Sequence, residues 1–279
     1  EAKHDVRIRE ADLPGCKEQG YKIAGKPRFF WTLQLSNHFV YLLGKAANTV
    51  TAQISKESFY MSNLQTSFRY DYVGSFLRPT ELKKARADYE AGSICAEALK
   101  SVEDQCIAQL VAKQKAAGYH VITDGEFRRA TWHLDFMWGF QGIGHQETDC
   151  GLPFHDEAAK IDDTYLTGKL SVNAHRFVEH FKFVKALEDA NTVAKQTIPA
   201  PAQFLEQLVM PMNQETTRTV YPNDDELIAD IVAGYKKVIA DLYAAGCRNI
   251  QFDDCTWGCF VDPHAKLFFG ADDAQLKVL

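Results

Sequence analysis

Two stretches of this chain repeat one pattern, in which a helix ends at a glycine, a short strand follows, and acidic residues come next. Residues 116–126 and residues 244–254 both follow it. Gly118 and Gly246 suit the left-handed backbone position that ends a helix, and the extended residues after them favour a strand. Strands joined by a long helical crossover pair in parallel, since a hairpin cannot join them. The repeated pattern therefore predicts an α/β fold.

The acidic residues come at the carboxyl ends of the two predicted strands. In α/β barrels and doubly wound sheets this edge is where ligands bind. Glu126 follows the first strand, and Asp253 and Asp254 end the second. If the two ends share one mouth, the three carboxylates surround a single polar pocket. The alternative is structural, because acids often cap helices or pair with arginines such as Arg128 and Arg129.

Composition favours a soluble protein with a small-molecule partner. Of the 279 residues, 46% are hydrophobic and 24% are charged, which is typical of globular domains. A formal charge of -6 gives no basic surface for nucleic acid. Seven scattered cysteines do not resemble a small secreted disulfide scaffold and indicate a reducing, cytoplasmic compartment. The most apolar N-terminal window, residues 29–43, is interrupted by polar residues, so neither a membrane span nor a signal peptide is predicted.

Two domain regions are predicted. Residues 1–60 have no clear period or motif and are interpreted as an N-terminal extension of unknown role. Met61 could be the native start, or the preceding residues could cover one end of the main domain. Residues 61–279 are predicted to form one α/β domain that is shorter than the ~250 residues of a closed eight-stranded barrel. The barrel is therefore expected to be incomplete at the C-terminus.

Local patterns predict several elements within this domain. Alternating residues predict a strand over 69–76 that runs into a Gly74–Ser75 turn, and residues 127–167 read as a long irregular loop or lid. Residues 193–198 are predicted to be a strand that ends at a proline. Three helices are predicted. The first begins at Pro79 and Thr80, the second spans about residues 97–117, and the third begins at Asn223.

Three motifs, in this order, resemble the cobalamin-independent methionine synthase family, and most closely its short, single-barrel members. They are residues 72–79 (YVGSFLRP), 122–129 (ITDGEFRR) and 250–258 (IQFDDCTWG). The resemblance implies a TIM-type (β/α)8 barrel of the methionine synthase and uroporphyrinogen decarboxylase kind. It also implies transfer of a methyl group from 5-methyltetrahydrofolate, as the polyglutamate, to the thiol of homocysteine, with zinc activating the thiol.

The same resemblance implies roles for particular residues. The turn Val73, Gly74 and Ser75 matches the element that holds the carboxylate of homocysteine through backbone donors. Glu126 matches the acid that receives the ammonium group, and Asp253 matches a second acid at the same end. Asp254 is expected either to contact the ligand or to lie just behind the residues that do, and Arg128 is expected to lie behind them. Carboxylate acceptors for an ammonium group give charge-assisted hydrogen bonds, which orient an amino acid.

The chain departs from the family at the metal. The resemblance implies zinc ligands from a His-x-Cys pair, a later Glu and a final Cys, and no His-x-Cys occurs here. Either the last barrel strands are missing or the metal has been lost. Cys255, Cys259 and His264 are zinc candidates by residue type, although their spacing is unusual and buried or idle thiols are the favoured interpretation. The proton donor is not identified.

Other residues have both a functional and a structural interpretation. His120, His133 and His145 could be acids or ligands, but lone histidines are usually structural. A basic cluster beside the turn could attract a folate polyglutamate tail or could be a solvated face; it consists of Arg78, Lys83, Lys84 and Arg86. The alternative to a methyltransferase is a catalytically silent or partial ligand-binding barrel, or a related barrel enzyme that acts on another thiol.

Overall fold

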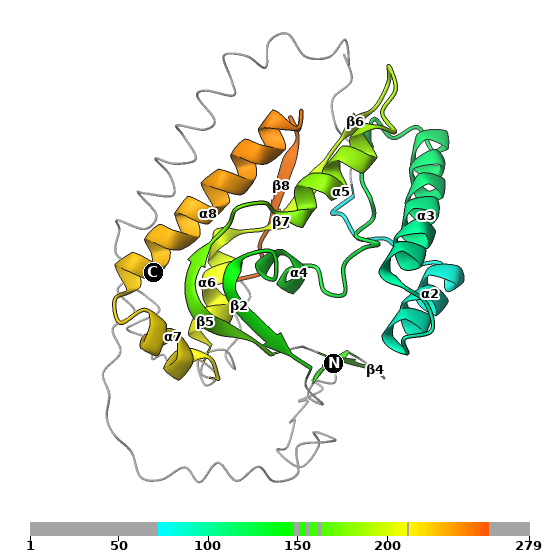
Figure 1. The fold of residues 1–279 in the computed structure, drawn as a ribbon. Coiled ribbons are helices and arrows are strands. Elements are labelled where there is room, and N and C mark those ends of the chain that lie inside the picture. Colours follow the sequence, from blue (N-terminus) through cyan, green and yellow to red (C-terminus); the bar gives the residue numbers. More distant parts are fainter. Residues whose placement is uncertain (1–71, 148–150, 155–156, 161–162, 211, 257–279) are drawn as a thin grey trace, which may run out of the picture.

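The computed structural model describes residues 72–147, 151–154, 157–160, 163–210 and 212–256 (Figure 1). Two pairs of parallel strands form its centre. Strand β1 (Val121–Ile122) pairs with β6 (Val193–Ala194), and β7 (Gln196–Pro199) pairs with β8 (Ile250–Asp253). The backbone N–H of Lys195 continues the ladder between these pairs, donating to the Ile122 carbonyl at 2.9 Å. Parallel pairing across long crossovers confirms the predicted α/β class.

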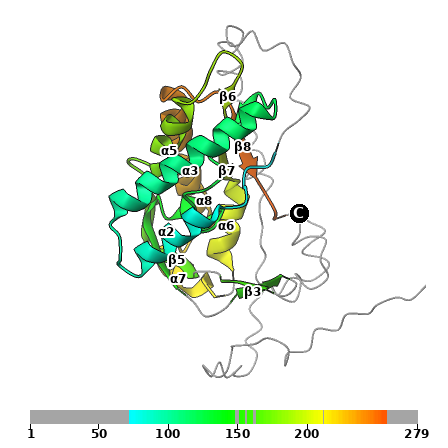
Figure 2. The same ribbon diagram turned by 90° about the vertical axis from the view of Figure 1, so that its right-hand side faces the viewer.

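Helices cover both sides of these strands. Figure 1 shows α8 along one side of β7 and β8, with α5 and then α3 toward the other side. Figure 2, turned by 90°, has α2 and α3 on the side toward the viewer. Helix α8 contacts α5 and α6, and α3 contacts α2 and α5. The helices are α2 (Thr80–Glu90), α3 (Ala96–Ala116), α4 (Leu134–Met137), α5 (Arg176–Lys185), α6 (Pro201–Val209), α7 (Gln214–Val220) and α8 (Asp224–Ala244).

The helix ends agree with the sequence predictions. Helices α3 and α8 stop just before Gly118 and Gly246, whose φ angles are 85° and 93°. Only a residue without a Cβ atom adopts this left-handed conformation freely. Helix α8 starts after Asn223, whose side chain accepts a hydrogen bond from the Asp225 backbone N–H at 2.9 Å. The glycines that end α3 and α8 set the direction in which the chain enters β1 and β8. They therefore determine where the acids at the end of each strand lie.

The Asn223 cap gives a first quantitative prediction. Replacing Asn223 with alanine leaves a terminal N–H of α8 without its side-chain acceptor, and we expect the free energy of unfolding to fall by about 1 kcal/mol. Urea denaturation measures the change. Asn223→Ser is the matched control, because serine keeps an acceptor oxygen at the cap. Equal losses in both variants would contradict a capping role.

Two sequence predictions about strands are wrong. Residues 127–167 are not an irregular loop, because they contain α4 and two antiparallel pairs. Strand β2 (Gln141–Gln146) pairs with β5 (Asp163–Ser171), and β3 (Gly151–Phe154) pairs with β4 (Glu157–Lys160). Two glycines in β2 obscure its alternation, and its register shifts between Gln141 and Ile143. The β2–β5 pairing joins residues 17 to 30 positions apart, which a local pattern does not reveal.

The strand predicted over 69–76 is also absent from its described part, residues 72–76. The carbonyl oxygens of Tyr72 and Val73 accept hydrogen bonds from the side chains of Lys195 and Gln251, at 2.6 Å each. Side-chain donors therefore take the place of a strand ladder here. The segment still lies beside the parallel strands.

The described strands form four two-stranded sheets and not a closed barrel. The described residues thus confirm a mixed α/β arrangement with parallel strand pairs, and they do not show a complete barrel of the kind that the resemblance implies. The proposed extension over residues 1–60, the start at Met61, and the residues Cys259 and His264 all lie outside the described residues. Among those described, no helix is both long and apolar enough to cross a membrane.

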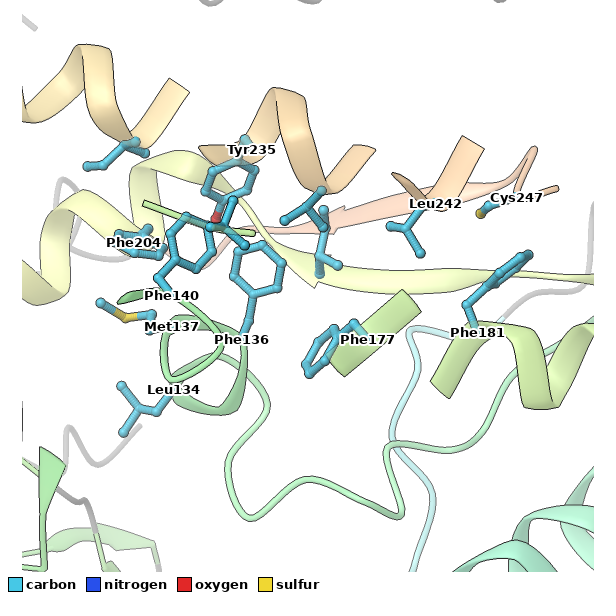
Figure 3. Packing of buried hydrophobic residues seen from close by; sticks show 14 of the residues in the cluster. Leu134, Phe136, Met137, Phe140, Phe177, Phe181, Phe204, Tyr235, Leu242 and Cys247 are labelled. Atoms are coloured by element: carbon cyan, nitrogen blue, oxygen red, sulfur yellow. The ribbon is translucent and has the colours of Figure 1, made fainter. Parts of the chain in front are cut away.

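An aromatic core anchors the strand ends. Figure 3 shows Phe136 and Phe140 from the α4 region beside Phe204 of α6 and Tyr235 of α8. Neighbouring rings in this group have centroids 4.9–6.5 Å apart, a spacing favourable for edge and tilted aromatic contacts. The Tyr235 hydroxyl donates to the Pro199 carbonyl at 2.9 Å. The core therefore holds the carboxyl end of β7 directly.

Candidate functional site

The turn that follows β1 has a strained backbone. Gly125 and Glu126 have φ angles of 65° and 60°, and Glu126 is the one described non-glycine residue with positive φ. The Asp124 carboxylate accepts from the Glu126 backbone N–H at 2.9 Å, and the Thr123 hydroxyl accepts from the Gly125 N–H at 3.0 Å. A Cβ atom on Gly125 would lie 2.3 Å from a methyl carbon of Leu110. Such strain costs stability and tends to occur at functional sites.

The Glu126 carboxylate lies inside the protein and keeps one oxygen available. Glu126 as a whole residue is 4% exposed. Its Oε1 atom accepts from Arg129 Nη1 and from the Thr197 hydroxyl, each at 3.1 Å. Within the described part of the chain, Oε2 accepts no hydrogen bond. A Cβ atom on Gly74 would lie 2.9 Å from Oε1, so the predicted glycine–serine turn packs directly against this acid.

Two acids of this site influence each other electrostatically. Burial raises the pKa of Glu126; Arg129 opposes this shift, and the charges of Asp124 and Asp253 add to it. Burial also raises the pKa of Asp253, against a lowering by its hydrogen bond from Gln251 and by nearby cations. Both pKa shifts mean that the carboxylate forms are poorly solvated, so a cation bound between them would be favoured.

Arg129 organises the centre of the site, and sequence reasoning considered it only as an ion-pair partner. It is 1% exposed, and its Nη2 donates to the Thr197 carbonyl at 2.7 Å and to the Thr197 hydroxyl at 2.8 Å. Its guanidinium carbon lies 4.5 Å from the centre of the Phe177 ring. The three-residue spacing from Glu126 was a usable signal for this pair. Nothing local in the sequence indicated Thr197.

Asp253 and Asp254 behave differently at the end of β8. The Asp253 carboxylate accepts from Gln251 Nε2, and its backbone carbonyl accepts from the Ala200 N–H at 2.7 Å. Asp254 is exposed, and its Oδ1 accepts from the backbone N–H of Thr256 at 2.9 Å and from the Thr256 hydroxyl at 2.6 Å. Asp253 lies near enough to Glu126 for its charge to raise the pKa of that acid, whereas Asp254 stabilises a local turn.

The arginines around the turn bind protein groups. Arg128 donates to Glu103 at 3.0 Å and to Asp104, both on α3, so it ties the turn to that helix. Arg78 donates to the carbonyl oxygens of Glu126 at 3.1 Å and of Arg129 at 2.6 Å. Arg78 therefore stabilises the backbone of the strained turn and does not form one surface with the other members of the predicted basic cluster.

The remaining members of that cluster are also engaged or solvated. Arg86 donates to the carbonyl oxygen of Phe127, and Lys84 pairs with Asp88 on the same helix face. Lys83 is exposed. Arg86 holds the chain after the strained turn, so the structure does not present the four cations as one joint surface.

The candidate histidines lie in structural surroundings. The His120 ring contacts the Asn191 carbonyl at 2.9 Å, and the His145 ring stacks on Trp138 with centroids 4.3 Å apart. Burial lowers the pKa of His133 to about 4. The Trp138 indole donates to the Thr164 hydroxyl at 3.0 Å. These contacts tie His120, His145 and Trp138 to other protein groups and not to Glu126.

The described residues do not fit a zinc site. Cys255 is exposed, and its thiol donates to the Gln203 side-chain carbonyl at 2.9 Å. Within residues 72–256, apart from the short gaps, no group of three or more His, Cys, Asp and Glu side chains could hold a metal ion. The other two candidates, Cys259 and His264, lie outside this part. We therefore derive no reaction step that passes through zinc.

Fold and site together define a class: an α/β protein whose parallel strands end at a buried acid packed against a glycine turn. No protein-family model matches the chain. The uncharacterized protein YxjH of Bacillus subtilis is 36% identical over 199 residues, which are 71% of this chain and 51% of YxjH. A 5-methyltetrahydropteroyltriglutamate–homocysteine methyltransferase of Thermosynechococcus vestitus is 25% identical over 182 residues, 65% of this chain and 22% of that enzyme.

A solved structure points the same way. A candidate vitamin-B12-independent methionine synthase of Listeria monocytogenes has 32% sequence identity and a TM-score of 0.56, covering 71% of this chain and 55% of that one. The chain is thus homologous to the cobalamin-independent methionine synthases, as its three motifs predicted. It spans about half the length of the Bacillus and Listeria proteins.

Proposed function

We propose that this chain provides the homocysteine-binding part of a methyltransferase that transfers a methyl group from 5-methyltetrahydrofolate to homocysteine. The observation that carries the proposal is the Glu126 carboxylate, which is buried, packed against Gly74 and open at Oε2. Homology to the cobalamin-independent methionine synthases supports the reaction class. The binding step can be derived from this chain's own residues.

An α-amino acid is a zwitterion and needs acceptors for its ammonium group and donors for its carboxylate. In the proposed complex Glu126 Oε2 accepts from the ammonium group, and Asp253 supplies a second negative charge at the same end. Backbone N–H groups of Val73, Gly74 and Ser75 would hold the carboxylate. Charge-assisted hydrogen bonds of this kind are about twice as strong as neutral ones. Arg129 and Thr197 keep Glu126 in place through its other oxygen.

The proposal predicts a specific loss of affinity. Glu126→Gln keeps the side-chain shape and an acceptor oxygen but removes the charge that the ammonium group would meet. We expect homocysteine binding to weaken by roughly 1.5–3 kcal/mol, measured by isothermal titration calorimetry. Glu179→Gln, an exposed change on α5, is the matched control. Unchanged affinity in Glu126→Gln would remove this acid from the binding site.

The proposal also predicts how homocysteine affinity depends on pH in the wild-type protein and in Glu126→Gln. Protonation of Glu126 removes the charged acceptor, so wild-type affinity should decrease as pH falls. Because burial raises the pKa of Glu126 above its usual 4.5, the decrease should begin at a higher pH than for an exposed glutamate. Glu126→Gln should lack this component. Calorimetry from pH 8 to pH 5, checked for folding by circular dichroism, measures both curves; parallel curves would count against the assignment.

Methyl transfer itself needs a separate assay. Purified protein is incubated with labelled 5-methyltetrahydrofolate and several thiols, with and without added zinc. Methionine formation would support the proposed substrate pair, whereas activity confined to another thiol would contradict homocysteine as the acceptor. Homocysteine binding that is weak, independent of zinc and not followed by transfer would support a silent binding domain.

A further inference from the structure

Lys195 and Gln251 connect three parts of the proposed site that are far apart in the sequence. Lys195 lies between β6 and β7 and is 4% exposed. Its Nζ atom donates to the Tyr72 carbonyl at 2.6 Å and to Gln251 Oε1 at 2.7 Å. Gln251 is on β8, two residues before Asp253. One ammonium group thus joins the segment before the glycine–serine turn to the strand that carries the second acid.

The ammonium group also decides which way the Gln251 amide points. Gln251 Nε2 donates to the Val73 carbonyl at 2.6 Å and to the Asp253 carboxylate. An ammonium group can only donate, so the amide oxygen must face Lys195. The amide nitrogen then faces the two acceptors. The reversed amide would place its oxygen against both of those acceptor oxygens, which is unfavourable.

We propose that Lys195 and Gln251 are positioning residues for amino-acid binding. Lys195 orients the Gln251 amide, and the amide holds the Val73 backbone and the Asp253 carboxylate in one fixed relation. The turn and the acid can then meet the carboxylate and ammonium ends of the same ligand. This inference rests on the proposed function, because it takes an α-amino acid as the ligand.

The first test needs no ligand. Carbon-13 labelling of aspartate carboxyl groups allows the Asp253 titration to be followed by NMR, with Asp253→Asn used for assignment. The Gln251 hydrogen bond and the Lys195 charge both lower the pKa of Asp253. Gln251→Met and Lys195→Met should therefore each raise its titration midpoint. Lys237→Met, an exposed change on α8, should leave it as in wild type. An unchanged midpoint in Gln251→Met would overturn the proposal.

The second test measures ligand binding on the same proteins. Gln251→Met should weaken homocysteine binding about tenfold in calorimetry, since one hydrogen bond to a charged group is lost and the turn is released. Lys195→Met should act in the same direction, and Lys195→Arg should restore binding, because a guanidinium group is also only a donor. Binding equal to wild type in Gln251→Met and Lys195→Met would overturn the positioning role.

The two tests separate the possible failures. If wild-type protein does not bind homocysteine, the proposed function fails. The NMR titration still decides whether the hydrogen bonds from Lys195 to Gln251 and from Gln251 to Asp253 influence that acid. Unfolding midpoints of all variants show whether any loss is global. If Lys195→Met does not fold, Gln251→Met, at a half-buried position, carries both measurements.

Discussion

Arg129→Met is expected to lower the free energy of unfolding by about 3–5 kcal/mol, because it leaves a buried carboxylate without its ion-pair partner. The Arg129 and Glu126 side chains are 1% and 5% exposed, and their charged atoms lie 3.1 Å apart. The variant also removes both hydrogen bonds to Thr197. Guanidinium denaturation measures the loss. Lys100→Met breaks the exposed pair with Asp104 on α3, and there we expect less than about 1 kcal/mol.

A double variant identifies the cause of that loss. In Arg129→Met the remaining Glu126 charge is the main penalty, so adding Glu126→Gln should recover part of the stability. Strictly additive losses would contradict this, and would indicate that Arg129 acts through packing against Phe177 instead. The result would also separate the stability of the site from its affinity for ligand.

The second large effect concerns acid stability and depends on His175. This residue is 2% exposed; its Nε2 contacts the Phe136 carbonyl at 2.9 Å, and its Nδ1 accepts from the Phe177 N–H at 3.2 Å as the cap of α5. Nε2 must therefore donate and Nδ1 must stay unprotonated, so the folded protein holds the neutral ring. Burial, the largest cause, lowers the pKa of His175 from 6.5 to about 4.

The sign of the effect follows from proton uptake. Between pH 6.5 and pH 4 the unfolded chain binds a proton at His175 and the folded protein does not, so stability decreases as pH falls. The loss from this residue should reach about 3 kcal/mol at pH 4. His175→Asn keeps a capping side chain and should flatten the pH dependence by that amount, as measured by urea denaturation at several pH values.

The control for this experiment is a variant that is destabilised at a site that does not titrate. Asn223→Ala should show the wild-type pH dependence at lower overall stability. His133, whose pKa is also lowered to about 4, retains its contribution in both variants. A slope in His175→Asn that equals the wild-type slope would mean that His175 takes up its proton over the same pH range in the folded and unfolded protein, and would contradict the prediction.

Much of the candidate site was predictable from the sequence because its residues follow local signals. Glu126 follows a helix, a glycine and a strand, Asp253 ends a strand of the same kind, and parallel pairing brings such ends to one edge of a sheet. Gly74 was predicted as a turn residue, and its contact with Glu126 explains why a side chain is excluded there. The roles of these residues in binding remain predictions.

Other parts of the site could not be predicted, because they depend on partners far along the chain. Thr197 reaches Arg129 across 68 residues, and Gln251 reaches Val73 across 178. In the sequence alone, Thr197 and Gln251 each look like an ordinary strand position. The segment before Gly74 has strand-like alternation, yet its carbonyl oxygens bind side chains.

The sequence by itself determined where α2 and α8 start, where α3 and α8 stop, and which acids follow which strand. These features depend on backbone conformation and hydrogen bonds within a few residues, such as the left-handed glycines after α3 and α8. Only the tertiary structure decided which Glu126 oxygen is occupied and which stays open, and that Lys195 orients Gln251. Burial and the direction of a hydrogen bond depend on groups that folding brings together from distant segments, and no local pattern contains that information.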